Sequence, residues 1–357
     1  MGIPWIAGLG GHTVAVTRRN LLIGVGVVVA FVLVVGGVLL FRSGDEGTQT
    51  TTSVPDTSTS TTTTTRVPNP TAPLTGLEAS SPEVAGRCAV TVKIGNMADA
   101  HPQYQVSDAD VVYEQVVDGG ITRLAAVYQS KSPNHVGSVR SVRPTDKYIL
   151  WPLRGVFTFS GGNHYEMASL NGVPVVWVTE NDTDLLFRGP GRAPNNLFAK
   201  VDEIYSRCED PAPAPLFAYR PEGTPAVGTP TTDVVVGFGR GYDTAWTWDA
   251  PAGVWQRTIF DAPDLDPDGN RVGTENVVVM QVRYPPDPTG NTVEAAMLGE
   301  GPVTVFTGGV RIDGTWRRPV METAAELIGP DGAPIALTPG RTWVELMPLG
   351  NPVTATP

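Results

Sequence analysis

The stretch Leu21–Phe41 limits the fold of this chain more than any other feature. Its sequence, LLIGVGVVVAFVLVVGGVLLF, holds no charged side chain. A helix over these residues rises about 31 Å, which matches the hydrocarbon core of a bilayer. We therefore expect one transmembrane helix over residues 21–41 rather than a helix buried in a soluble core.

The residues beside this stretch indicate that it is an anchor and give it a direction. A cleaved signal peptide is the alternative, but FRSGDEG after the stretch contains no small-residue cleavage site, and no cysteine lies nearby for lipidation. Arg18 and Arg19 precede it, while Asp45 and Glu46 follow. The positive-inside rule then predicts a single-pass protein of the cell membrane, with residues 1–20 as a cytoplasmic tail and the later domains extracytoplasmic.

Residues 42–72 are rich in threonine and serine and include TSTSTTTTT at 57–65. Such a composition offers little apolar surface to bury, so it does not offset the entropy lost on ordering. We expect a disordered stalk that holds the folded part away from the bilayer.

The charge is strongly acidic outside the membrane. All 36 Asp and Glu residues follow Arg42, and the formal net charge of the chain is −11. Binding to a polyanionic backbone depends on clustered Lys and Arg. The composition therefore argues against a nucleic-acid partner.

The pattern after the stalk predicts an α+β chain with two domains. The first, 73–215, is expected to be a mixed α/β domain, and a Pro-rich linker (216–230) separates it from a mostly β domain (231–350) and a short tail (351–357). β-branched and aromatic runs predict strands, and apolar residues at helical spacing predict helices. The expected strands of the first domain are 88–94, 110–117, 122–129 and 155–160; the expected helices are 144–153, 163–170, 197–208 and one near Ala324 in the second domain.

Several segments are distinctive enough to compare with a known family. They are AVTVKIGNMADAHPQYQVSDADVVYEQVVDGGITRLAAVYQS (89–130), VGSVRSVRPTD (136–146), FSGG (159–162), RAPNNLF (192–198), NVVVMQV (276–282), GTW (314–316) and LTPGRTWVELMP (337–348). Together they resemble the YerB-like family of bacterial envelope proteins, a two-domain family of unknown function. The resemblance implies an extracytoplasmic location but no catalytic residues. Many members look like lipoproteins, so it also implies that an apolar helix replaces their lipid anchor.

The two cysteines, Cys88 and Cys208, both fall in the first expected domain. An even pair in an oxidising compartment favours a disulfide, and two separate buried thiols are the alternative.

Charged and amide side chains of the first expected domain form the candidate ligand site. Arginine suits forked hydrogen bonds to carboxylate or phosphate, so the basic concentration in GGITR and SVRSVRPTD is the centre of this hypothesis. The candidate residues are Arg123, Arg140, Arg143, Glu114, Asp110, His101, Asn195 and Asn196. The alternative is structural: turn capping around SDAD and ion pairs between these arginines and neighbouring carboxylates, including Glu114 with Arg123. No metal site and no cofactor are predicted.

The segment Asp264–Glu275, DLDPDGNRVGTE, fits the spacing of a calcium-binding loop. Strand-like runs flank it where an EF-hand needs helices, so a β-hairpin connection is the favoured interpretation. Weak calcium binding stays open as the alternative.

The chain contains no Walker loop, H-E-x-x-H or G-x-S-x-G motif. The favoured hypothesis is a membrane-tethered envelope protein without enzymatic activity, which binds a cell-wall polymer or an envelope protein. The alternative is an enzyme acting on cell-wall glycan or peptide through a cleft in the first domain.

Overall fold

The computed structural model describes residues 67–286, 290 and 292–357, which belong to one compact unit. The expected cytoplasmic tail, the expected membrane helix (21–41) and stalk residues 42–66 lie outside these described residues. Within the described ranges, no helix combines the length and the apolar character needed to cross a membrane.

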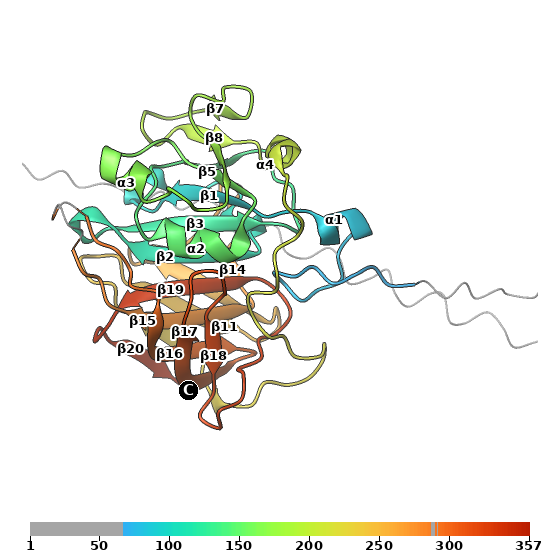
Figure 1. Ribbon diagram of the computed structural model, residues 1–357. Helices are drawn as coiled ribbons and strands as arrows, with labels where there is room; N and C mark the ends of the chain where they lie inside the picture. The colour runs from blue at the N-terminus through green and yellow to red at the C-terminus, as the bar shows by residue number, and fades with distance from the viewer. Residues whose placement is uncertain (1–66, 287–289, 291) are drawn as a thin grey trace, which may run out of the picture. The chain divides into compact units, whose positions relative to one another are not determined.

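The described residues are mostly β-structure, and their largest element is an 11-stranded sheet (Figure 1). Its strands, in spatial order, are β18 (Glu326–Ile328), β17 (Val310–Arg318), β16 (Gly299–Thr307), β15 (Asn276–Val282), β19 (Thr342–Pro348), β2 (Val111–Val116), β3 (Thr122–Tyr128), β1 (Val90–Gly95), β5 (Val156–Thr158) and β6 (Val176–Val178), with β9 (Thr229–Pro230) paired to β17.

Strand β19 connects the early and late halves of this sheet. It runs parallel to β15 on one side and parallel to β2 on the other, and in the second pairing Glu345 lies opposite Glu114. The backbone N–H of Thr342 also donates to the carbonyl of Asp110 at 3.0 Å. The two expected domains thus contribute strands to one continuous hydrogen-bonded sheet.

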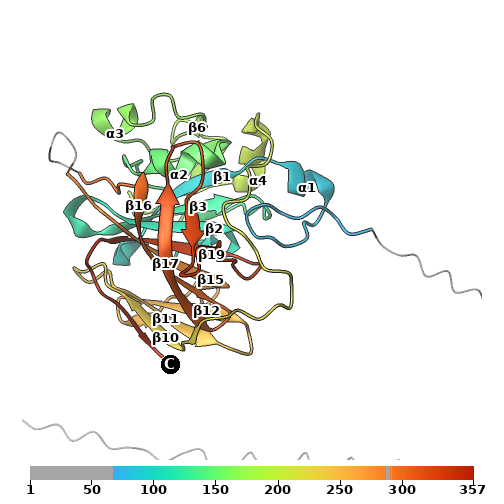
Figure 2. The same ribbon diagram turned by 60° about the horizontal axis from the view of Figure 1, so that its bottom comes forward.

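Two smaller sheets accompany the large one (Figures 1 and 2). The six-stranded sheet comprises β13 (Ala262–Pro263), β12 (Val254–Ile259), β11 (Thr244–Asp249), β10 (Asp233–Val236) and β20 (Val353–Thr356), with β14 (Gly273–Thr274) paired to β12. The three-stranded sheet comprises β4 (Val136–Gly137), β8 (Leu197–Ala199) and β7 (Leu186–Arg188).

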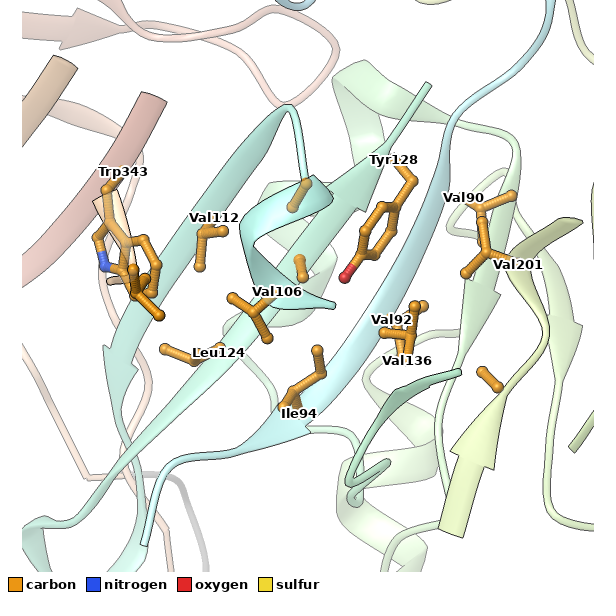
Figure 3. Packing of buried hydrophobic residues seen from close by; sticks show 14 of the residues in the cluster. Val90, Val92, Ile94, Val106, Val112, Leu124, Tyr128, Val136, Val201 and Trp343 are labelled. Atoms are coloured by element: carbon orange, nitrogen blue, oxygen red, sulfur yellow. The ribbon is translucent and has the colours of Figure 1, made fainter. Parts of the chain in front are cut away.

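Both small sheets pack against the same apolar face of the large sheet. Figure 3 shows part of this core, in which Val92 of the large sheet lies beside Val136 of β4, and Leu124 and Tyr128 belong to the same cluster. Trp343 of β19 contacts Trp246 of β11, with ring centroids 5.4 Å apart. Apolar burial at these contacts holds the layers together.

The opposite face of the large sheet is covered by the helix α2 (Asp146–Leu153), whose Ile149 and Leu153 pack on Ala125 and Val111. Coverage on both faces explains why the residues of β1, β2 and β3 are buried almost throughout rather than alternately buried and exposed. In β10, by contrast, buried and exposed residues alternate.

The remaining helices are short and precede residue 208. They are α1 (Pro82–Gly86), α3 (His164–Ala168) and α4 (Val201–Ile204), with 3-10 turns η1 (Ala98–Ala100), η2 (Val106–Asp108), η3 (Asp118–Gly120) and η4 (Tyr205–Arg207).

The helix expected over 197–208 is wrong in its first part. Leu197–Ala199 form strand β8 and pair with both β7 and β4, so the helical segments begin only at Val201. The helix expected near Ala324 is also absent from the described structure, where a turn leads into β18. In both places pairing with a distant strand outweighs local helical spacing.

Segments expected to lie outside the two domains take part in the packing. Residues 67–72, assigned to the stalk by composition, include Ala72, which is buried, and Thr71, which bridges to Glu78. In the expected linker Leu216 is buried. The expected tail contains β20, which pairs with β10.

Candidate functional site

The structure divides the eight candidate residues among different places. His101 and Glu114 lie in one buried network, Arg123, Arg140, Arg143 and Asn195 in a second cluster, and Asp110 and Asn196 apart from both. The described structure therefore has no single site that contains all of them.

Asp110 fastens the start of β2 to the end of β3. Its buried carboxylate accepts hydrogen bonds from the backbone N–H of Gln129 at 2.5 Å and of Ser130 at 2.7 Å, and from the Ser130 hydroxyl. Burial raises the pKa of Asp110, although these bonds act in the opposite direction. Because its acceptor capacity is used by the protein, Asp110 serves the fold.

Glu114 occupies the face of β2 that packs against the six-stranded sheet. It forms an ion pair at 2.7 Å with Arg257 of β12, and it accepts hydrogen bonds from Asn96 at 2.9 Å and Thr122 at 2.8 Å. The pairing with Arg123 considered from the sequence is replaced by this contact, because Arg123 lies on the opposite face. The first and second expected domains are thereby linked through a buried charge.

Asp264 and His101 extend this network. Arg257 also pairs with Asp264 at 2.5 Å, and His101 Nδ1 lies 3.3 Å from the other oxygen of Asp264. His101 Nε2 lies 3.1 Å from Asn96 Oδ1, so its two ring nitrogens each have a partner. The carboxylate of Asp264 is therefore committed to the protein rather than to a calcium ion.

The rest of the calcium-like segment forms a turn between β13 and β14. Asp266 accepts hydrogen bonds from the backbone N–H groups of Asp268 and Asn270, as turn-forming aspartates commonly do. Among the residues that the structure describes, no group of three or more His, Cys, Asp or Glu side chains is placed to hold a metal ion.

Glu345 lies beside Glu114 in the parallel pairing of β19 with β2, and both side chains are fully buried. Its carboxyl group accepts hydrogen bonds from Trp246 Nε1 at 3.0 Å and from the Thr244 hydroxyl at 3.1 Å. Burial, and next the Glu114 carboxylate, raise the pKa of Glu345 well above its ordinary value. Loss of the Glu345 proton is therefore disfavoured beside the Glu114–Arg257 ion pair.

The second cluster, which we call the arginine cluster, lies on the α2 side of the large sheet. It comprises Lys93, Gln115, Asp118, Arg123, Ser138, Arg140, Arg143, Asp146, Glu166 and Asn195. Arg123 stands opposite Gly95 of β1 and Gln115 of β2 in the strand register, so its side chain shares a face with these positions. The loops after β1 and β5 border this end of the sheet.

Both terminal nitrogens of Arg143 are engaged within the protein. It forms ion pairs with Asp118 at 2.8 Å and with Glu166 at 2.9 Å, and it donates to the carbonyl of Val142. Glu166 is itself held by Asn163, the N-cap of α3, in a capping box. The role of Arg143 is therefore to connect the β2–β3 turn with α3.

Lys93 and Asp146 form a buried ion pair at 2.7 Å. Asp146 also accepts hydrogen bonds from Gln115 Nε2 and from the backbone N–H of Arg143, each at 2.7 Å. Burial lowers the pKa of Lys93 to about 8. These residues complete the inner layer of the arginine cluster, and both carboxylate oxygens of Asp146 accept hydrogen bonds within the protein.

Arg123 and Arg140 differ from the other cations of the cluster. Arg123 donates to the carbonyl of Ser141 at 2.9 Å, and Arg140 donates to Asn195 Oδ1. In the described ranges neither guanidinium forms an ion pair. Burial, and next the charges of Arg143 and Arg140, lower the pKa of Arg123 to about 10. The positive charge at this position is thus incompletely balanced.

Gly95 makes room for Arg140 beside Arg123. A Cβ atom at Gly95 would lie 3.1 Å from Cγ of Arg140 and 3.4 Å from the Ser138 hydroxyl oxygen. The aliphatic part of Arg140 therefore crosses the strand where Gly95 has no side chain. The arrangement depends on this glycine for space rather than for backbone freedom.

The arginine cluster lies near the carboxyl ends of two parallel strands. β1 and β5 run parallel, and the segment that carries Arg140 meets both of them near their carboxyl ends. The backbone N–H of Arg140 donates to the carbonyl of Lys93 in β1, and the backbone N–H of Ser160, after β5, donates to the carbonyl of Arg140. Crevices at carboxyl ends of parallel strands are frequent ligand sites in sheets covered by helices. Asn196, by contrast, lies in the loop between β7 and β8 and accepts a hydrogen bond from the exposed Arg188 at the end of β7.

Several residues of the two networks escaped the sequence analysis. Lys93 offered a signal, since it is a lone cation within the apolar run AVTVKI, and a charge in a buried strand needs a partner. Arg257 and Glu345 offered only a weak one, because their strands VWQRTI and TWVELMP are less uniform. The partner of Arg257 in β2 is Glu114, which lies 143 positions away in the sequence.

Comparisons with known proteins agree with this fold. The family described as "Protein of unknown function (DUF3048) N-terminal domain" matches residues 74–213, and its C-terminal domain matches residues 234–344. The Bacillus subtilis (strain 168) protein described as "Putative lipoprotein YerB" is 25% identical over 291 residues, which cover 78% of this chain and 86% of that protein. The crystal structure of the YerB protein from Bacillus subtilis has a TM-score of 0.71 at 23% identity, covering 80% of this chain and 100% of that one. The resemblance to the YerB-like family is confirmed.

Proposed function

Since this chain belongs to the DUF3048 family, a two-domain family of unknown function, we propose that it is a membrane-tethered envelope protein that binds a wall-associated ligand at the arginine cluster. The binding surface in this proposal is formed by Arg123, Arg140 and Asn195, with Arg143 and Lys93 as the supporting inner layer.

Two features support the tether. Leu21–Phe41 has the length and composition of a membrane-spanning helix, and the acidic chain after it suits an exposed extracytoplasmic domain. The similar Bacillus subtilis protein is described as "Putative lipoprotein YerB", and a lipoprotein is a protein held at a membrane by an attached lipid. We infer that this chain reaches a comparable position through its apolar helix and the threonine-rich stalk.

The observation that carries the ligand-binding proposal is the unpaired charge of Arg123 and Arg140. Each is wholly or partly buried and donates one described hydrogen bond to a neutral oxygen, although a guanidinium offers five N–H donors. Placing two such cations side by side is unfavourable unless an anion joins them. A ligand that brings a negative oxygen group satisfies both.

Binding is better supported than the alternative of a wall-cleaving enzyme. Glycan hydrolysis commonly uses two carboxyl groups that flank the substrate. Here Asp110, Glu114, Asp146 and Glu166 are all buried and hydrogen-bonded or ion-paired within the protein. None of these four is presented to a substrate.

Sedimentation with purified bacterial cell walls tests the proposal. The full chain, purified in detergent, is expected to pellet with the walls, and retention is expected to fall as salt rises because charge pairing is screened. The double variant R123Q/R140Q should remain in the supernatant. R192Q, which removes an exposed arginine from a neighbouring loop, is the matched control and should pellet like the wild type. Equal retention of the double variant and the control would contradict the proposal.

A further inference from the structure

The charges of the arginine cluster leave a surplus of one positive charge. Its cations are Lys93, Arg123, Arg140 and Arg143, and its carboxylates are Asp118, Asp146 and Glu166. Asp99 also influences Arg140, but it is exposed and forms no ion pair with it in the described structure. Water screens such an exposed charge strongly.

The surplus is localised on the outer two arginines. Asp146 forms its ion pair with Lys93, and Asp118 and Glu166 both form theirs with Arg143. The inner layer therefore holds three carboxylates and two cations, a net charge of −1, and the two positive charges of Arg123 and Arg140 turn this into a surplus of one positive charge. Arg123 and Arg140 are left to share whatever anion enters from outside.

Neutral donors accompany the two guanidinium groups. Ser138 is 2% exposed, and its hydroxyl has no hydrogen-bond partner among the residues described. This hydroxyl and the stem of Arg140 both lie close to Gly95. Asn195 accepts from Arg140 through Oδ1, which leaves its amide NH2 group as a donor. A buried hydroxyl without a partner is costly, so a ligand oxygen at this position brings a direct gain.

We propose that the arginine cluster binds a singly charged oxyanion, meaning a phosphodiester or carboxylate group of the ligand, between Arg123 and Arg140. This inference rests on the proposed function and names the chemical group that the function requires. One negative charge neutralises the cluster, whereas a doubly charged group leaves a net negative charge beside Asp118 and Asp146. A neutral glycan satisfies the donors but not the charge.

The experiment measures small-anion binding to the detergent-purified full chain by isothermal titration calorimetry at constant ionic strength. The probes are dimethyl phosphate for the phosphodiester and acetate for the carboxylate, with sulfate as the doubly charged comparison and trimethyl phosphate as the neutral one. We expect at least one singly charged probe to bind more tightly than both comparisons. The tighter of the two identifies the group on the ligand.

Variants assign the binding to the two arginines. R123Q and R140Q are each expected to lower the affinity for the favoured probe by about tenfold or more, the range for a lost hydrogen bond to a charged group. R123K and R140K keep the charge but lose the fork, so an intermediate loss is expected. R192Q should bind like the wild type. Circular dichroism and the Tm of each variant establish that it is folded, and R140Q is the decisive variant if R123Q unfolds.

The outcomes separate this inference from the proposed function. Retention on walls without competition by either singly charged probe would overturn the oxyanion assignment and leave wall binding standing. Binding of a singly charged probe without retention on walls would support the assignment and overturn wall binding. Tighter binding of sulfate, or probe binding that R123Q and R140Q leave unchanged, would also overturn the assignment.

Discussion

The guanidinium of Arg257 and the carboxylate of Glu114 form a fully buried ion pair at 2.7 Å across 143 positions of sequence. Arg257 belongs to the six-stranded sheet and Glu114 to the large one, so this pair joins the two layers. Arg257 also lies 4.6 Å from the ring centre of Trp343, on the strand that links the halves of the large sheet. Burial by itself lowers the pKa of Arg257, but the nearby Glu114 and Asp264 carboxylates raise it overall.

Replacing Arg257 by methionine is expected to destabilise the fold strongly. The change leaves Glu114 and Asp264 buried without their cation, and breaking a buried pair in this way costs about 3–5 kcal/mol. The free energy of urea-induced unfolding at pH 7 measures the loss. R188M is the control, because Arg188 and Glu180 form an exposed pair, where the loss should stay below about 1 kcal/mol. Equal losses in the two variants would count against a structural role for Arg257.

Glu345 is expected to make the fold less stable as pH rises. Its folded pKa lies well above the value of 4.5 for an unfolded chain, so its favourable contribution is complete below pH 4.5 and declines as pH rises toward the folded pKa. E345Q cannot titrate, and its amide oxygen can still accept the bonds from Trp246 and Thr244. The unfolding free energy of E345Q relative to the wild type should therefore increase between pH 5 and pH 8, with a slope of up to about 1.4 kcal/mol per pH unit.

The control for this pH series is E326Q, which removes an exposed carboxylate on β18. A parallel dependence in wild type and E345Q would show that Glu345 does not carry the effect. Lys93 also titrates: its lowered pKa of about 8 makes the stability of the fold rise between pH 8 and 10.5. Because Lys93 is present in both proteins, the difference in unfolding free energy between E345Q and the wild type reports Glu345 alone.

The disulfide between Cys88 and Cys208 is expected to contribute substantially to stability. It closes a segment with a sequence separation of 120 residues, with the two Cα atoms 6.0 Å apart. In the chain-entropy model, closing a loop of this size stabilises by about 4–5 kcal/mol. C88A/C208A should therefore unfold at a lower urea concentration, and reductant should lower the wild-type midpoint toward it. If reductant also lowered the urea midpoint of C88A/C208A, which has no disulfide to reduce, this account would be contradicted.

Gly95 is expected to affect ligand binding because its missing side chain leaves room for the stem of Arg140. A valine at this position places methyl groups against the stem of Arg140, which must move away from Arg123. We expect about tenfold weaker binding of the favoured singly charged probe, equivalent to ~1.4 kcal/mol, and a stability loss of about 1–3 kcal/mol from overpacking. G86V is the matched control because a Cβ atom at Gly86 meets nothing within 4 Å. Unchanged affinity in a folded G95V would refute this account of the glycine.

The expected membrane anchor is tested by placing a charge in its centre. F31R puts an arginine in the middle of Leu21–Phe41, at a cost of about 2.5–3.5 kcal/mol for insertion, while F31L keeps the stretch apolar. The wild type and F31L should resist extraction of membranes with alkaline carbonate, and F31R should be released more readily. Release of all three proteins alike would argue that the stretch is not an anchor.

Much of the fold was predictable where local pattern and burial agree. The strand around Val92 ends one residue beyond the segment expected for it, and the strand around Leu124 and the helix at Asp146–Leu153 lie within theirs. Continuous β-branched runs and helical apolar spacing are local signals. Leu197–Ala199 was misassigned since its helical spacing is equally local, but two neighbouring strands were available to pair with it.

The sequence predicted the residue types of the candidate site but not the division of those residues between two separate clusters. The basic concentration at Arg123, Arg140 and Arg143 stood out from an acidic chain, and these three lie in one cluster. His101 and Glu114 were grouped with them by closeness in sequence. The alternation of a strand instead places Glu114 on the face opposite Arg123, where it meets Arg257.

The amino-acid sequence by itself determined the apolar stretch Leu21–Phe41, the acidic character of the chain after it, the family, and most of the β-rich elements, because each depends on composition or on neighbours within a few residues. Only the tertiary structure decided that β19 lies between β2 and β15, that Glu345 stands beside Glu114, and that Arg123 and Arg140 share a surplus charge. The physical reason is that these relationships arise when distant segments bury their apolar faces together, and the charges carried with them must then find partners across the layers.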